Sequence, residues 1–96
     1  MFYPNAEARF FSFEGSISVP CTVRIKDNLI FVVCKGNGEI SFKGVLEKGG
    51  HYVLRSDESD SLAYLHAANP KRLEGSTFYA NDEGMWRINL GDAEKK

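Results

Sequence analysis

The sequence predicts an all-β domain in which a single antiparallel meander of about seven or eight short strands closes into a small barrel or roll. Apolar and polar residues alternate with a period of two along most of the chain, as expected for strands with one buried side. Clusters of Gly, Asn, Asp and Pro interrupt these runs at short intervals. The 96 residues suffice for one hydrophobic core but not for two. A two-sheet sandwich is the alternative arrangement.

The expected strands follow one another with few residues between them. They are rich in Val, Ile, Phe, Tyr and Thr, which favour extended backbone, and they cover residues 10–18, 21–26, 29–35, 39–47, 52–56, 62–67, 72–79 and 85–90. Residues 4–9, which begin at Pro4, fit a single helical turn. Residues 91–96 form a polar tail that we expect to fray, which leaves residues 1–90 as the domain.

A short glycine motif recurs along the chain. An apolar residue, a charged residue and a glycine follow one another in Phe13-Glu14-Gly15, Phe42-Lys43-Gly44 and Leu73-Glu74-Gly75. One interpretation is a structural repeat in which glycine relieves crowding where a strand coils sharply. The other is coincidence, since matches of three residues arise easily in any β protein.

The last expected strand supports closure of the meander. After Gly84, Trp86, Ile88 and Leu90 alternate with Met85, Arg87 and Asn89. With this ending and the rhythm of short hairpins, the pattern resembles in miniature the calycin architecture of lipocalins and avidins. The resemblance implies a closed barrel, which leaves no unpaired sheet edge. We expect Trp86 in the core, where its indole N–H needs an acceptor, and a ligand cavity around it is the alternative.

The most informative hairpin is joined by Asp27 and Asn28. Both residue types tolerate the positive φ that two-residue loops require. If they form the loop, cross-strand partners sum to 55, which pairs Ile25 with Ile30, Val23 with Val32 and Cys21 with Cys34. This side of the hairpin is wholly apolar, so we expect it to point into the core.

The two cysteines of this hairpin, Cys21 and Cys34, allow two interpretations. Directly opposed cysteines could form a disulfide or a redox switch across the strands. Alternatively, they are two buried thiols that pack as small hydrophobic groups. The sequence begins without a signal-peptide pattern, so we expect a cytoplasmic protein whose thiols stay reduced. The second interpretation is therefore favoured.

The other side of the same hairpin is the strongest functional candidate. It combines cations with large apolar groups, whereas a solvated side should be polar throughout; its residues are Thr22, Arg24, Lys26, Leu29, Phe31, Val33 and Lys35. One possibility is that the aromatic N-terminus (Phe2, Tyr3, Phe10 and Phe11) folds over it. The other is an interface for a protein partner or a second copy of the chain, since Arg and aromatic residues anchor such surfaces. Nucleic acid is disfavoured because the net charge is −1 and the pI is near 6.1.

A second hypothesis is a small-molecule-binding barrel with a shallow apolar pocket. Tyr64 and His66 share one side of their strand, and together with Trp86 they could line the mouth of the barrel. Against this, a barrel of 96 residues has an interior largely filled by its own side chains.

Catalysis, metal binding and membrane insertion have no support in the sequence. The chain contains no phosphate-binding, dinucleotide-binding, zinc-protease or serine-hydrolase motif. Its two His and two Cys are far apart in sequence, and the acidic segments 56–60 and 81–83 lack the order of an EF-hand. The longest apolar run, residues 29–34, is too short to span a bilayer. We therefore expect a non-catalytic protein-interaction module without a cofactor or metal.

Overall fold

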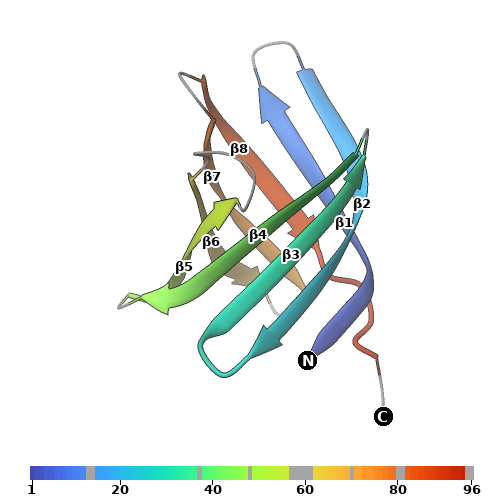
Figure 1. Cartoon of the computed structure of the whole chain (residues 1–96), viewed down its shortest axis with the longest axis vertical. Coiled ribbons are helices and arrows are strands. Elements are labelled where there is room, and N and C mark those ends of the chain that lie inside the picture. The colour runs from blue at the N-terminus through green and yellow to red at the C-terminus, as the bar shows by residue number, and fades with distance from the viewer. Residues whose placement is uncertain are drawn as a thin grey trace.

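A computed structural model describes residues 1–12, 15–36, 38–47, 49–56, 62–69, 71–79 and 82–94. The chain forms eight strands, which are β1 (Phe2–Ser12), β2 (Gly15–Lys26), β3 (Leu29–Gly36), β4 (Gly38–Glu47), β5 (His51–Ser56), β6 (Leu62–Asn69), β7 (Arg72–Tyr79) and β8 (Asp82–Asn89). Each strand pairs antiparallel with the next, and β1 also pairs with β8 (Figure 1). The predicted all-β meander is thus confirmed as a closed barrel rather than a two-sheet sandwich.

The first two strands differ from the prediction. The helical turn expected over residues 4–9 is wrong, because these residues lie in β1, which pairs with β2 on one side and β8 on the other. Ala6 and Ala8 are buried in the core, so tertiary burial overrides the local preference. Pro4 lies within the register shift between Tyr3 and Ala6, where the ladder is already interrupted.

The strand predicted over residues 10–18 is in fact shared by β1 and β2. β1 ends at Ser12 and β2 begins at Gly15, and these two residues pair across the strands. β2 continues through Pro20, where the prediction placed a gap. The β2–β3 register begins at Cys21, so Pro20 lies just outside that ladder and its missing N–H costs no pairing there.

The tail and the N-terminus are both held against the barrel. In the tail that we expected to fray, the Glu94 N–H donates to the Phe2 carbonyl at 2.7 Å, and residues 95 and 96 lie outside the described residues. The Met1 amino group donates to the Ile25 carbonyl at 2.7 Å, and the Ile25 N–H donates to the Met1 carbonyl at 2.8 Å. Figure 1 shows the N-terminus and the described tail at the end of the barrel where β2 turns into β3.

Trp86 is central to the core, as predicted. It is 1% exposed and stacks on Phe10 at 5.6 Å between ring centroids, with Phe42 tilted against it at 5.1 Å. Its indole Nε1–H donates to the Tyr64 carbonyl at 3.1 Å, which supplies the expected acceptor. Every strand contributes buried side chains around it, including Ala8, Val23, Ile30, Val32, Leu54, Ala63, Leu65, Leu73 and Ile88.

Two glycines of the recurring motif share a structural role. A Cβ atom at Gly44 would lie 2.6 Å from the Val53 carbonyl oxygen, and a Cβ at Gly75 would overlap the Tyr64 carbonyl. Both positions therefore need glycine because the neighbouring backbone approaches closely. Gly15 differs, since its Cβ direction is open and its φ of +124° is the constraint. Phe13 and Glu14 lie outside the described residues.

Candidate functional site

The predicted β2–β3 hairpin register is confirmed. Asp27 has a φ of 55° in the loop, and the pairs are Cys21–Cys34, Thr22–Val33, Val23–Val32, Arg24–Phe31, Ile25–Ile30 and Lys26–Leu29. The residues expected inside are buried, except that Ile25 is half-buried at the barrel end. Because successive side chains on a strand point to opposite faces, the predicted interface residues lie on the outside of the barrel.

Cys21 and Cys34 lie on the inside as free thiols, 2% and 3% exposed. A hydrogen bond between the two thiols, followed by burial, raises the pKa of the Cys21 thiol far above its usual range. The same bond lowers the pKa of the Cys34 thiol, against the effect of burial. Nucleophilic attack requires the thiolate, and burial of both sulfur atoms disfavours that charged form. The pair thus has the environment of the buried thiols that the sequence interpretation favoured.

The outer side of the hairpin contains all seven predicted interface residues. Arg24, Lys26 and Lys35 are exposed, Leu29 is 38% exposed, and the remaining three residues (Thr22, Phe31 and Val33) are half-buried. These side chains share one continuous outer surface because they occupy alternate positions on paired strands.

The barrel extends this surface onto β4 and β5. Phe31 pairs with Lys43 and Leu29 with Val45, while β5 places Arg55 opposite Lys43 and Val53 opposite Val45. We call the part of this outer surface on β2–β5 where cations surround apolar side chains the basic–apolar face; it consists of Arg24, Lys26, Leu29, Phe31, Lys43, Val45, Val53 and Arg55. The sequence interpretation missed the four residues on β4 and β5. Extending the alternation of each strand across successive hairpin registers would have found them.

The aromatic N-terminus does not cover the basic–apolar face. Tyr3 and Phe10 pack against the core, and Phe11 lies under the Arg87 guanidinium at 5.6 Å. Phe2 contacts the edge of the face, where the Arg24 guanidinium lies 4.7 Å above its ring. The N-terminal aromatic residues are therefore used elsewhere, and the valines and Leu29 at the centre of the face stay in contact with solvent.

The cations of this face have no carboxylate partner within the part of the chain that the structure describes. Its ion pairs join Lys71 to Asp92, and Arg72 and Arg87 to Glu74. Arg24, Lys26, Lys43 and Arg55 take part in none of them. Lys43 Nζ lies 5.8 Å above the Phe31 ring, a cation–π contact that keeps its charge exposed. The face thus combines apolar surface with cations that form no ion pair in the described structure, although Glu47 and Glu94 line hollows beside them.

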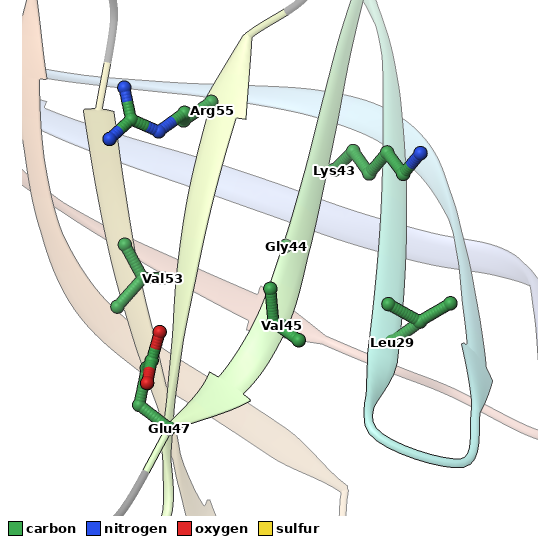
Figure 2. A pocket seen from close by; sticks show the side chains of 7 residues that line it. All are labelled: Leu29, Lys43, Gly44, Val45, Glu47, Val53 and Arg55. Carbon is green, nitrogen blue, oxygen red and sulfur yellow. The ribbon is translucent and has the colours of Figure 1, made fainter.

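A shallow hollow of about 340 Å³ lies at the β4–β5 side of the face, lined by Leu29, Lys43, Gly44, Val45, Glu47, Val53 and Arg55. Figure 2 shows Lys43 and Arg55 at one end, the three aliphatic side chains in the middle and Glu47 at the other end. The register explains this order, because three successive outward pairs are Lys43–Arg55, Val45–Val53 and Glu47–His51.

The structure does not bring Tyr64, His66 and Trp86 together in one pocket. Ala63 and Leu65 are buried, so Tyr64 and His66 point outward, whereas Trp86 points inward. The described hydrogen bond between Trp86 and Tyr64 involves the backbone carbonyl of Tyr64 and not its side chain. The indole ring packs against Phe10 and Phe42 in the core.

The outer side of β5–β7 holds a juxtaposition that the sequence did not suggest. His51 and His66, the two histidines of the chain, are direct cross-strand partners, and His66 in turn pairs with Glu74. They line a hollow of about 670 Å³ together with Tyr64. Within the described ranges, no group of three or more His, Cys, Asp or Glu side chains is arranged to hold a metal ion.

Comparisons with family models, with curated proteins and with solved structures found no match. None of these comparisons supports the calycin resemblance drawn from the sequence, so the structure shows an all-β meander barrel and no family. Among the described residues, no helix is long and apolar enough to cross a membrane.

Proposed function

We propose that the protein is a non-catalytic interaction module that binds an acidic protein partner through the basic–apolar face. One observation carries this proposal: four cations without an ion pair in the described structure surround an apolar centre. These cations are Arg24, Lys26, Lys43 and Arg55. Apolar area supplies affinity on burial, while complementary charge selects the partner and speeds association. A protein surface rich in Asp and Glu beside aliphatic groups satisfies both features.

The charge favours a different protein over a second copy of the chain. A two-fold symmetric dimer brings the same patch of both copies together. A dimer that stacks the cationic ends of both copies is unfavourable because like charges repel, and a reversed dimer offers Lys43 and Arg55 only Glu47 while it leaves Arg24 and Lys26 without a countercharge from this face. An acidic partner can meet all four cations, so we place hetero-association above the homodimer.

A protein partner also fits better than single-stranded nucleic acid. Proteins that bind single strands present aromatic faces for base stacking in a strongly positive groove. Here the Phe2 and Phe31 rings are already covered on one side by Arg24 and Lys43. The net charge of −1 also lacks the positive field that drives phosphate binding.

The test is selection from a randomised peptide library displayed on yeast. We expect the purified protein to enrich peptides that combine Asp or Glu with aliphatic residues. Replacing Lys43 and Arg55 by Glu should abolish binding of the selected peptides. The matched control replaces Arg9 and Lys71 by Glu, which changes the net charge equally on other parts of the surface and should leave binding intact.

Two outcomes would overturn the proposal. One is a selection without acidic enrichment, or an equal loss of binding in the two charge variants. The other is tighter binding of oligo(dT) than of any selected peptide, measured by fluorescence anisotropy at physiological salt.

A small-molecule site is the second candidate, and it is supported by the hollow of about 670 Å³ beside His51, Tyr64 and His66. This hollow lies on the outside of the barrel rather than at the barrel mouth expected from the sequence, and Trp86 does not line it. Histidine NMR resonances that shift on addition of a mixture of small aromatic and carboxylate compounds would support it. Unchanged resonances across the mixture would refute it.

A further inference from the structure

The hollow on β4 and β5 carries an ordered pattern of charge. Along the strands, the outward pairs read cation with cation (Lys43–Arg55), valine with valine (Val45–Val53), and carboxylate with imidazole (Glu47–His51). Alternate residues on a strand are about 6.6 Å apart, so successive pairs repeat at that spacing. The ladder is therefore a short line of three sites that differ in the chemistry they prefer.

We propose that this ladder recognises an extended segment whose alternate side chains are a carboxylate, an aliphatic group and a cation. The proposal rests on the proposed function and names the segment that the acidic partner presents. The carboxylate lies between Lys43 and Arg55, the aliphatic side chain lies on Val45 and Val53, and the cation lies at Glu47.

The spacing fits an extended chain. In such a chain, residues i, i+2 and i+4 point to one side with the same repeat of about 6.6 Å. Leu29 on β3 and Tyr64 on β6 border the valine pair on either side. Neighbouring strands lie about 4.8 Å apart, so one extended segment matches the width of the two-strand ladder.

The charges in the ladder are available for a partner. In the described part of the chain, Lys43, Arg55 and Glu47 form no ion pair. Glu47 is exposed, and its backbone carbonyl accepts the Gly50 N–H at 3.3 Å, so the turn fixes its backbone position while its carboxylate remains free of ion pairing. An anion is attracted to Lys43 and Arg55 at one end of the ladder and repelled by Glu47 at the other. This difference fixes the direction in which the segment lies on the ladder.

The test uses synthetic peptides with the protein as it stands. The alternating peptide has the core Asp-Thr-Val-Thr-Lys. A spacing control, Asp-Val-Thr-Thr-Lys, has the same composition but turns the valine to the opposite side of an extended chain. A charge control, Asp-Thr-Val-Thr-Asp, replaces the cation. Affinities are measured by NMR titration, which also reports whether the amide signals of β4 and β5 shift.

We expect the alternating peptide to bind about three- to tenfold more tightly than either control, which is the usual size of one exposed charge or apolar contact. Glu47→Lys should invert the preference between the alternating peptide and the charge control. Gln in place of Glu47 should remove the preference without inverting it, which separates charge recognition from a change of shape.

The results distinguish failure of this inference from failure of the proposed function. Equal binding of the three peptides, or no binding of the alternating peptide up to about 1 mM, overturns the ordered ladder. The proposed function then still stands if the library peptides depend on Lys43 and Arg55. If the library peptides are also indifferent to those two residues, both proposals fail.

Discussion

Two parts of the barrel surface use their arginines in opposite ways. On β7 and β8, the Arg87 Nε–H donates to Glu74 Oε1 at 3.1 Å, and Arg72 Nε lies 3.3 Å from the same oxygen. Arg72 Nε approaches without the alignment of a hydrogen bond. On β2–β5, Arg24 and Arg55 have no carboxylate within the residues that the structure describes. The two parts differ in whether the chain itself supplies the countercharge.

The arginines on β7 and β8 therefore interact with the chain itself, whereas those on β2–β5 form no ion pair in the described structure. On β6–β8, the chain supplies partners on both sides of the sheet: inside, the Trp86 indole donates to the Tyr64 carbonyl, and outside, Arg87 donates to Glu74. Removing the buried indole would leave the Tyr64 carbonyl without this partner, which costs stability. The exposed cations of the basic–apolar face contribute little to folding, because exposed charges interact weakly in water. The following variants test this division.

The largest expected effect is that of Gly75→Ala on the β6–β8 wall. The added methyl group overlaps the Tyr64 carbonyl, and since backbone is harder to move than a side chain, we expect a loss of about 3 kcal/mol in the free energy of unfolding. Urea denaturation measures it. Ser76→Ala, one residue along the same strand, is the control and should lie within about 1 kcal/mol of the wild type. A wild-type stability for Gly75→Ala would contradict the close approach.

Trp86→Phe should have the next largest effect. It removes the indole N–H that bonds to the Tyr64 carbonyl and leaves a small void between Phe10 and Phe42. We expect a loss of about 2 kcal/mol, the sum of an unsatisfied buried acceptor and lost packing. Thermal unfolding followed by circular dichroism measures it. If the variant unfolds at the wild-type temperature, the indole hydrogen bond is not part of the core.

Glu74→Gln should reduce stability by about 1 kcal/mol, because two half-exposed arginines lose their shared countercharge. The matched control is Glu47→Gln, which removes a carboxylate that has no ion pair in the described structure and should change stability by less than about 0.5 kcal/mol. Comparing the two urea midpoints at low salt and at 1 M NaCl is informative, since salt should shrink the Glu74 effect. Equal losses for both variants would remove the contrast between the two parts.

The smallest effect is expected from Lys43→Gln combined with Arg55→Gln on the basic–apolar face. Both side chains are exposed, so stability should stay within about 0.5 kcal/mol of the wild type or rise slightly as the two cations no longer repel. Binding of the library-selected peptides should nevertheless fall. A loss of stability above about 1 kcal/mol would show that these residues belong to the fold.

Part of the candidate site followed directly from local sequence. Asp27 and Asn28 form a two-residue loop, so the pairing of the flanking residues has little freedom, and alternation then decides which side is buried. This is why Arg24 and Phe31 could be placed opposite each other on the outside. The prediction failed over residues 4–20, where Pro4 suggested the start of a helical turn and residues 19–20 fell between two predicted strands, although β1 and β2 run through both positions.

By itself, the sequence determined the all-β class, the register of the β2–β3 hairpin and the buried position of Trp86, because these depend on short loops and a period of two. Only the tertiary structure decided the rest. Closure of β1 against β8, the approach of Tyr64 to Gly75 and the extension of the hairpin surface onto Lys43 and Arg55 join segments through successive registers. The order of charges on β4 and β5 likewise exists only once both strands are paired, since neither strand alone places a second cation beside the first.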